Sequence, residues 1–355
     1  MKIKAQKQII ESILINLQPF LEKKDASQIT SHILFNSQND KCIVKATDGE
    51  IGLEIVTDNI IIEAEGSFTA NGKKLLDIIR ILKDDEIILE LLDNTLIVKQ
   101  KHSKFKLPTF DPDTYPSFPS KEEKPQISLD SLSLIQNLKK ISPAIDTNNP
   151  KFELNGALIN IKNDSTDLVG TDTRRLAIAK IESSNEEELS LIVPKKAILE
   201  IQKLFLDQIN IYFDETNLII GNDNYFFYTR LINGKFPDYQ RIVPSSVKHS
   251  IALPKREMLD AIKMITTISQ EIKMTLLSDT IIFNSLSADN VEAKTELEIN
   301  TGLNEKFELS FNSKYILDFI SQVDKNEFVI EFNEPSLPFI VKDDNFITII
   351  MPIVA

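Results

Sequence analysis

The feature that most constrains this chain is an internal repeat of about 120 residues, which occurs three times. Asp48, in Ala-Thr-Asp-Gly, returns 124 positions later as Asp172 and, less clearly, 117 positions after that as Asp289. An amphipathic segment keeps nearly the same steps, at residues 73–79, 195–201 and 313–319. Because this spacing accounts for all 355 residues, the chain is predicted to be three tandem copies of one unit, with little room for an inserted catalytic domain.

Each unit has the same order of expected elements: a helix, several strands, a second helix and more strands. Apolar residues with helical spacing predict six helices, at residues 6–18, 73–83, 130–141, 195–206, 254–268 and 312–322. Runs of β-branched and aromatic residues predict strands at 41–46, 51–57, 86–92, 95–100, 191–193, 208–213, 217–220, 225–231, 280–284, 327–332 and 346–351. The expected fold class is α+β, with two helices packed on antiparallel sheets in each unit.

Prolines mark the expected joints between the units, because proline ends regular strand pairing. They crowd the ends of the first two units, at Pro108, Pro112, Pro116, Pro119, Pro237 and Pro244. The linkers repeat as well, since Tyr115 and Tyr239 are again 124 positions apart. The predicted domains are residues 1–120, 121–247 and 248–355.

Composition argues against several classes of protein. Hydrophobic residues make up 42% of the chain and charged residues 26%, which is ordinary for a globular protein. The sequence has no signal-peptide pattern and no apolar run long enough to span a membrane, so a cytoplasmic protein without membrane contact is expected. The single cysteine, Cys42, is expected to be a small buried residue rather than part of a disulfide or metal site.

Motifs for cofactors and catalysis are also missing. Nine glycines provide no dinucleotide or ATP phosphate loop, so no cofactor is predicted. His32, His102 and His249 lack partners at metal-ligand spacing, so no metal is predicted and each histidine is expected to be solvated. Asp111 and Asp113 form an Asp-x-Asp pair, but they lie in a proline-rich joint with no companion motif.

Asp172 stands beside two arginines, which could indicate a phosphate-handling site. Its counterpart Asp48 lacks those arginines, so a turn aspartate that accepts hydrogen bonds from backbone donors explains both positions better. No catalytic residue is predicted.

Charge is segregated along the chain. The six expected helices contain fourteen Lys and Arg residues against seven Asp and Glu residues, although the whole chain has a net charge of −13. Lysine is a good helix former on solvated faces, but the excess occurs in four of the six helices. If the helices share one face, that face is a positive track that attracts DNA without sequence-specific contact.

Three stretches resemble the bacterial sliding clamp family, the β subunits of the replicative DNA polymerase. They are residues 154–156 with 170–177, residues 231–244, and residues 349–353. The second stretch matches the family's Gly-x-Phe-Pro-Asp-Tyr-x-Arg-x-x-Pro pattern at every fixed position. The threefold repeat extends the likeness over the whole chain.

The resemblance implies a head-to-tail homodimeric ring of six domains, with twelve helices lining a channel that holds duplex DNA. Closure by one contact repeated twice fits the rule that head-to-tail interfaces can form rings. The resemblance matches Phe105 and Leu107 of the first unit to the dimer interface, with Ile268 near their partner in the third. Candidate DNA-facing residues on the helices are Lys73, Lys74, Lys139, Lys140, Lys195, Lys196, Lys203, Lys255, Arg256 and Lys263.

The resemblance also implies a cleft between the second and third domains. In the family this cleft receives short peptides rich in Gln, Leu and Phe from polymerases, the clamp loader and repair proteins. The matching positions are Leu154, Thr171, Thr173, Arg174, Arg175, Leu176, Pro237, Arg241, Ile242, Ile349, Ile350, Met351, Pro352 and Ile353, with Ser336 and Pro338. Without the flanking motif, Leu154, Leu176 and Ile350 would be interpreted as core residues.

The chain departs from the family pattern at two places. Thr173 and Arg174 stand where the family has a small residue followed by His or an aromatic residue. The end, Val354-Ala355, lacks the family's Arg-Leu finish. The preferred peptide is therefore expected to differ from the common one.

Three hypotheses follow for the function. The leading one is a non-enzymatic processivity factor, a ring that tethers a polymerase to DNA. The second is an acidic three-domain adaptor that binds peptides without encircling DNA. The third is an enzyme that uses Asp111, Asp113 or Asp172, for which no substrate can be named.

Overall fold

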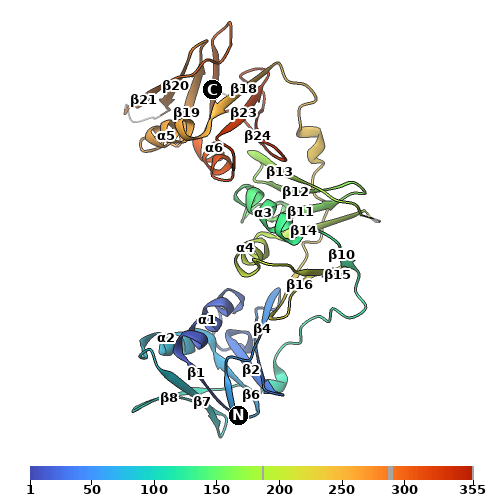
Figure 1. Cartoon of the computed structure of the whole chain (residues 1–355), viewed down its shortest axis with the longest axis vertical. Coiled ribbons are helices and arrows are strands. Elements are labelled where there is room, and N and C mark those ends of the chain that lie inside the picture. Colours follow the sequence, from blue (N-terminus) through green and yellow to red (C-terminus); the bar gives the residue numbers. More distant parts are fainter. Residues whose placement is uncertain (186–187, 287–290, 354–355) are drawn as a thin grey trace. The chain divides into compact units, whose positions relative to one another are not determined.

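This computed structural model describes residues 1–185, 188–286 and 291–353 (Figure 1). The chain forms two compact units, one made of Met1–Ser131 with Lys203–Leu231 and the other of Leu132–Gln202 with Ile232–Ala355. The middle repeat is therefore divided between the two units. Asp289, the expected turn aspartate of the third repeat, lies outside the described residues.

The first unit contains two antiparallel sheets. The five-stranded sheet has the order β5 (Ile61–Ala64), β1 (Lys2–Gln6), β7 (Glu86–Leu92), β8 (Thr95–Gln100), β9 (Ser103–Pro108). The eight-stranded sheet has the order β10 (Gln126–Ile127), β15 (Asn210–Phe213), β16 (Asn217–Gly221), β17 (Tyr225–Arg230), β4 (Ile51–Thr57), β3 (Lys41–Thr47), β2 (His32–Gln38), β6 (Gly66–Asn71).

The second unit follows the same plan. Its eight-stranded sheet has the order β14 (Leu189–Pro194), β11 (Gly156–Ile161), β12 (Ser165–Thr171), β13 (Arg175–Glu182), β25 (Phe346–Ile350), β24 (Phe339–Asp343), β23 (Glu327–Phe332), β18 (His249–Pro254). Its four-stranded sheet has the order β21 (Lys294–Glu298), β20 (Thr280–Ser285), β19 (Glu271–Leu276), β22 (Phe307–Asn312).

Six α-helices occur among the described residues, and each lies within an expected range or extends it by one residue. They are α1 (Lys7–Leu17), α2 (Gly72–Ile81), α3 (Ser131–Ile141), α4 (Lys195–Leu204), α5 (Lys255–Thr266) and α6 (Ser313–Ile320). In α2 the stripe Leu75, Leu76 and Ile79 is buried, which contributes about 2 kcal/mol for each side chain. None of the helices in the described ranges has the length and apolar character needed to cross a membrane.

The threefold repeat is confirmed as three copies of an α+β unit. The helices α1, α3 and α5 begin at Lys7, Ser131 and Lys255, which are 124 positions apart. All three first residues bond to a carbonyl just beyond the second helix of their repeat: Lys7 Nζ donates to Leu82 at 2.7 Å, Ser131 Oγ to Ile209 at 3.2 Å, and Lys255 Nζ to Val323. The two lysine contacts place positive charge near a helix C-terminus, where the macrodipole favours it.

Each of the eleven expected strand ranges falls on a strand. The other strands among the described residues, which outnumber these eleven, are not predicted by the sequence patterns. Strands β12 and β13 are buried on both faces, so they do not alternate between polar and apolar residues. Strand β21 has the sequence Lys-Thr-Glu-Leu-Glu, in which charged residues hide the pattern of an edge strand.

The linkers are fixed to the sheets through their tyrosines. Tyr115 Oη donates to the His32 carbonyl at 3.0 Å, and Tyr239 Oη donates to Asp167 Oδ2 at 2.6 Å. His32 lies under the first linker, where its ring contacts Phe110 at a centroid distance of 4.5 Å. The expectation that His32 is solvated is therefore wrong, because the folded-back linker covers it. Cys42 is buried, as expected.

Burial of His32 should make folding depend on pH. Burial, with a smaller contribution from Lys74, lowers the pKa of His32 to about 4. The unfolded chain binds a proton here below about pH 6.5 and the folded protein does not, so stability should fall by up to ~3 kcal/mol between pH 7 and pH 4. We expect His32→Asn, which can still bond to Thr69, to flatten this part of the pH profile measured by urea unfolding. The matched control is His102→Asn, at an exposed position. Equal profiles for wild type and His32→Asn would contradict the prediction.

Candidate functional site

Each unit contains one joint at which two repeats share a sheet. Strand β4 of the first repeat pairs with β17 of the second, and β13 of the second pairs with β25 of the third. The same backbone bond extends both pairs: Arg230 N donates to Glu50 O at 2.8 Å, and Met351 N donates to Arg174 O at 3.0 Å. The two joints can therefore be compared residue by residue.

The turn before the inner strand is the same at both joints. Asp48 Oδ1 accepts from the backbone of Glu50 and Ile51, and Asp172 Oδ1 accepts from Arg174 and Arg175, all at 3.0 Å. Both aspartates are turn residues that satisfy backbone donors, as predicted.

Thr173 is strained in this turn. It has φ 72°, whereas the equivalent residue of the first joint is Gly49, with φ 92°. A β-branched residue in the left-handed region is rare and costs about 1–2 kcal/mol. Strain of this kind tends to collect at binding sites.

Arg175 is a buried cross-link between the second and third repeats. Its side chain is only 3% exposed and forms ion pairs with Asp172 at 3.0 Å and with Asp318 of α6 at 2.7 Å. It also donates to the Pro143 carbonyl and lies 4.7 Å from the centroid of the Tyr315 ring. With these partners Arg175 ties the start of β13 to α6.

The first joint is closed at this end by its own side chains. The Phe118 ring packs on Tyr228 at a centroid distance of 4.9 Å, and Gly52 leaves room for the tyrosine, because a Cβ there would collide with it. Glu50 and Arg230 form an ion pair across the end of the joint at 3.4 Å.

The second joint is open at the same end. The counterpart of Phe118 is Ile242, which is 44% exposed, and the counterparts of Glu50 and Arg230 are Arg174 and Met351, which cannot pair. A pocket of about 520 Å³ opens here. It is lined by Arg174, Glu271, Asn312, Tyr315, Met351, Pro352 and Ile353.

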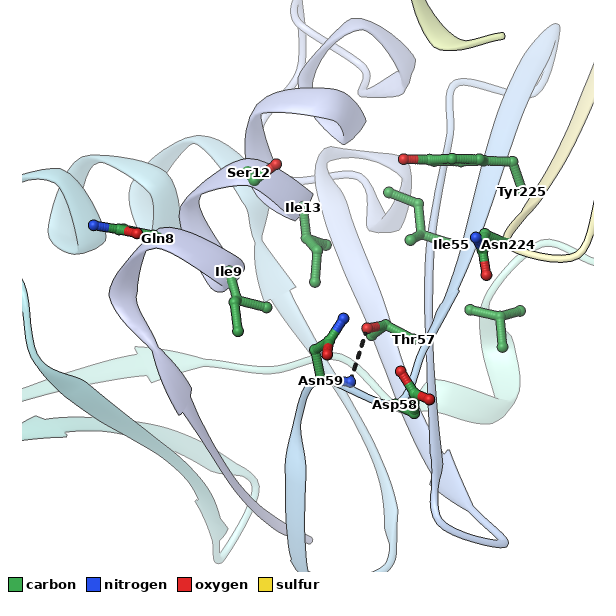
Figure 2. Close-up of a pocket in the computed structure, with 11 residues that line it drawn as sticks. Gln8, Ile9, Ser12, Ile13, Ile55, Thr57, Asp58, Asn59, Asn224 and Tyr225 are labelled. Carbon is green, nitrogen blue, oxygen red and sulfur yellow. Dashed lines mark hydrogen bonds between the residues drawn. The ribbon is translucent and has the colours of Figure 1, made fainter. Parts of the chain in front are cut away.

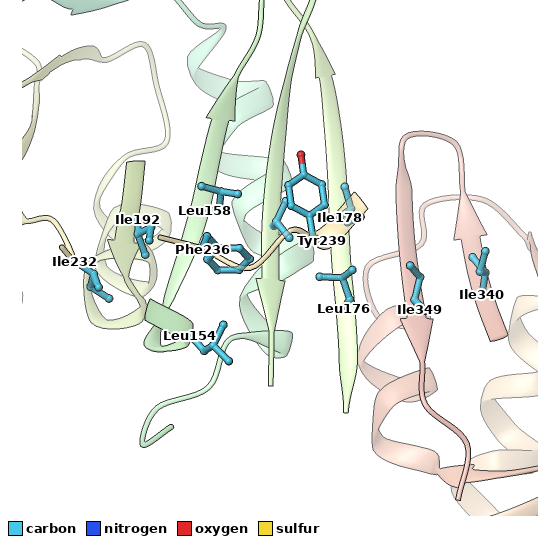
Figure 3. Close-up of a cluster of buried hydrophobic side chains, with 11 residues drawn as sticks. Leu154, Leu158, Leu176, Ile178, Ile192, Ile232, Phe236, Tyr239, Ile340 and Ile349 are labelled. Carbon is cyan, nitrogen blue, oxygen red and sulfur yellow. The ribbon is translucent and has the colours of Figure 1, made fainter. Parts of the chain in front are cut away.

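A buried apolar cluster contains several of the predicted cleft residues (Figure 3). It contains Leu154 and Leu176 from the second repeat and Ile349 from the third, each at most 3% exposed. Figure 3 shows Phe236 and Tyr239 of the second linker among the same side chains. The predicted cleft residues thus include core positions as well as surface ones.

The structure sorts the predicted cleft residues by exposure. The exposed ones are Thr173, Arg174, Pro237, Arg241, Ile242, Ser336, Met351 and Ile353. The half-buried ones are Thr171, Pro338 and Pro352, and the buried ones are Leu154, Arg175, Leu176, Ile349 and Ile350. Four of them, Arg174, Met351, Pro352 and Ile353, meet on the pocket. The role of the set in peptide binding stays a prediction.

Sequence reasoning missed Glu271, Asn312 and Tyr315. From the sequence, Asn312 and Tyr315 belong to the helix predicted at residues 312–322 and not to a site. In the structure Asn312 caps α6, since its Oδ1 accepts from Lys314 N at 3.0 Å. Burial, followed by the Asp172 carboxylate, raises the pKa of Tyr315. Only the fold brings this helix start to the end of β25.

The predicted DNA-facing residues fall into two groups. Lys73, Lys74, Lys139, Lys196, Lys203, Arg256 and Lys263 are exposed, whereas Lys140, Lys195 and Lys255 are half-buried. The amine of Lys195 bonds to the Ile145 carbonyl, and burial, with nearby Lys314 and Arg175, lowers its pKa. Lys140 donates to Asn345 Oδ1 at 3.3 Å, and Lys255 bonds to Val323. These three amines thus have acceptors within the chain.

The predicted interface residues lie at or near sheet edges. Phe105 and Leu107 are on β9, which pairs only with β8 among the described strands, and Leu107 is buried. Ile268, just beyond α5, is exposed. Strand β21 likewise has one neighbour, β20, within the described part of the chain.

The alternative acidic sites have structural roles. Asp111 caps a short 3₁₀ turn, where its Oδ1 accepts from Asp113 N at 3.0 Å. No cluster of three or more metal-ligating side chains is found in residues 1–185, 188–286 and 291–353.

The chain matches three consecutive protein-family models, which together cover nearly all of it. These describe the DNA polymerase III beta subunit: its N-terminal domain at residues 1–119, its central domain at 128–238 and its C-terminal domain at 240–354. The beta sliding clamp of Helicobacter pylori strain J99 is 40% identical over 352 residues, which cover 97% of this chain and 94% of that protein. The beta sliding clamp of Staphylococcus aureus strain Mu50 is 28% identical, over 92% of both chains.

Solved structures agree. The Helicobacter pylori beta clamp bound to a DNA ligase peptide superposes with a TM-score of 0.94 at 41% identity, over 100% of both chains. The DNA polymerase III beta subunit of Pseudomonas aeruginosa, at 21% identity, shares the fold with a TM-score of 0.89.

The two turns offer a matched test of strain. We expect Thr173→Gly to stabilise the protein by about 1 kcal/mol, because glycine adopts this φ without strain. Gly49→Thr should destabilise it by a similar amount for conformational reasons alone, since a Cβ at Gly49 meets nothing within 4 Å. Urea unfolding measures both variants. Destabilisation by Thr173→Gly would show that the threonine side chain supports the fold.

Proposed function

Because the chain belongs to the family of DNA polymerase III beta subunits, the sliding clamps, we propose that it closes into a ring around duplex DNA and holds a polymerase there. Its function is that of a sliding clamp, a processivity factor for DNA polymerase. The observation that carries the proposal is the pair of joints, since they join three repeats through continuous sheets. Such joints suit a protein that must stay closed.

We propose that the ring is a head-to-tail homodimer built by the same rule as the joints. At each joint the last strand of one repeat pairs with the fourth strand of the repeat before it: β17 pairs with β4, and β25 pairs with β13. In the first repeat the last strand is β9, and in the third repeat the strand in the place of β4 and β13 is β21. Each of these two strands has one neighbour in the described part of the chain. Pairing of β9 with β21 of a second copy would close both ends and create a heterologous contact repeated twice.

Charge complementarity supports this pairing. Strand β9 carries Lys104 and Lys106 on its exposed side, and β21 carries Glu296 and Glu298. Opposite charges across neighbouring strands stabilise pairing and set its register. Phe105, Leu107 and Ile268 would supply the apolar part of the contact.

We further propose that the open end of the second joint is the site for partner peptides. Met351, Pro352 and Ile353 supply apolar walls, while Arg174 and Glu271 supply charge. A DNA ligase peptide binds the similar Helicobacter pylori clamp. For this chain the proposed partners are the replicative polymerase, the clamp loader and repair proteins.

The exposed lysines of the helices would face the DNA and hold it without reading its sequence. Attachment by topology needs no catalytic group, so we propose that the protein is a non-catalytic subunit. Since its proposed substrate is the bacterial chromosome, it would act in the cytoplasm.

Ring closure can be tested by charge reversal at the two edges. We expect Lys104→Glu with Lys106→Glu to weaken dimerisation at least tenfold in sedimentation velocity, and Glu296→Lys with Glu298→Lys to do the same. All four substitutions in one chain should restore the dimer, because the charges are then exchanged. A dimer constant unmoved by either reversal would contradict this pairing, and a wild-type monomer at all accessible concentrations would favour a peptide-binding adaptor.

The same variants test topological attachment to DNA. Wild-type protein, loaded on nicked circular DNA by a clamp loader, should stay bound and should be lost quickly once the circle is linearised. The two charge-reversed variants should not be retained, and the fourfold variant should be. Equal retention on circular and linear DNA would overturn the proposed function.

Peptide binding can be tested by closing the second joint as the first is closed. We expect Arg174→Glu with Met351→Arg to recreate the ion pair of Glu50 and Arg230 across the pocket and to weaken binding of a Gln/Leu/Phe-type peptide at least tenfold. The matched control, Glu50→Arg with Arg230→Met, changes the first joint and should bind the peptide normally. Fluorescence anisotropy with a labelled peptide measures both. Equal loss in the two variants would contradict the assignment.

A further inference from the structure

A second hollow lies at the opposite end of the first joint (Figure 2). It has a volume of about 450 Å³, within the range of small-ligand pockets. Helix α1 forms one side with Ile9 and Ile13, and the end of β4 with the following turn forms the other (Figure 2). Asn224 and Tyr225, at the start of β17, complete it.

The corresponding end of the second joint shows what normally fills this space. Val56 N donates to Asn224 O at 2.9 Å, and Lys180 N donates to Asn345 O at the same distance, so Asn224 and Asn345 are counterparts. The Asn345 amide donates to Asn137 Oδ1 at 3.1 Å and to the Lys180 carbonyl at 2.7 Å. The Lys140 ammonium then donates to Asn345 Oδ1.

The first joint lacks both filling groups. With the spacing of 124 residues that relates α1 to α3, Asn137 corresponds to Ile13 and Lys140 to Asn16. The side chain of Asn224 forms no hydrogen bond within the described residues. The side-chain amide is therefore hydrogen-bonded at the second joint, in Asn345, and has no such bond among the described residues at the first joint, in Asn224.

The lining of the hollow selects the charge of a ligand. Its apolar part comes from Ile9, Ile13 and Ile55. Among the described residues that line the hollow, only Asp58 and Tyr225 have ionisable side chains. The Asp58 carboxylate has no ion pair or hydrogen bond among the residues described. Such a lining favours a cation with a short apolar chain and disfavours phosphate.

We propose that this hollow binds an alkylammonium group, with its chain against the isoleucines and its ammonium near Asp58 and Asn224. The ligand would supply from outside what Lys140 supplies from within the chain at the second joint. The shared chemistry is that of a lysine side chain of a partner or of a free aliphatic diamine. This inference does not depend on the peptide site, which lies at the other joint.

The experiment follows the side-chain amide signal of Asn224 by NMR in the full-length protein. We expect 1,5-diaminopentane to shift it with a dissociation constant on the order of 1 mM, as expected for so small a ligand. Its neutral analogue 1-pentanol should bind about tenfold more weakly. Asp58→Asn, at an exposed turn position that folding tolerates, should weaken diamine binding about tenfold.

A refilled variant provides the matched control. Asn16→Lys places an amine where Lys140 stands at the second joint, so it should compete for the hollow and abolish diamine binding. Asn16→Met adds a chain of similar bulk without charge and should retain binding. A capped tripeptide with a central lysine identifies the source: binding of the peptide indicates a protein lysine, and binding of the diamine alone indicates a free polyamine.

Three results would overturn the proposal. They are equal binding of pentanol and diamine, unchanged diamine binding in Asp58→Asn, and no shift of Asn224 with any probe at about 50 mM, well above the expected constant.

Discussion

The backbone pairing of strands across the joints, β4 with β17 and β13 with β25, is the constraint on which the rest of this structure depends. A flexible linker would allow the repeats to move independently, whereas a continuous ladder of hydrogen bonds fixes the register between them. The linkers add to this constraint, because Tyr115 and Tyr239 bond to the strands that they cross. Pairing that uses backbone atoms also leaves the side chains at each joint free to diverge.

That freedom explains how one architecture carries different sites. At one end the first joint is closed by Phe118, Tyr228 and the Glu50–Arg230 pair, while the second is open. At the other end the second joint is closed by Asn345 with Asn137 and Lys140, while the first is open. Within the described residues, each joint therefore has a hollow at one end and packed or hydrogen-bonded side chains at the other. Because the backbone pairing corresponds at the two joints, the difference in where the hollows open comes from their side chains.

Much of this architecture was predictable from the sequence. Apolar residues with helical spacing predict the six α-helices of the described residues, and each predicted end lies within two residues of the observed one. Strands such as β13, buried on both faces, gave no alternating signal. For the site, the motif pointed to Arg174 and Met351, but Glu271 and Tyr315 join them only through pairing of β13 with β25, at a sequence separation that no local pattern reports. Arg175, which the family motif matches to the cleft, is 3% exposed and pairs with Asp318 of a distant helix, a partner that no local sequence pattern reports.

The distribution of charge follows from the same repeat. A net charge of −13 disfavours contact with nucleic acid overall, since like charges repel. The helices carry the opposite excess, but not every lysine on them is available. Lys7 and Lys255 stand at equivalent helix starts, and both bond to carbonyls beyond the second helix of their repeat. Ser131 makes the equivalent bond in the middle repeat without any charge, so the contact itself is structural. Lysines at these starts therefore serve the fold first, and the exposed lysines of the helices are the ones that we propose to face DNA.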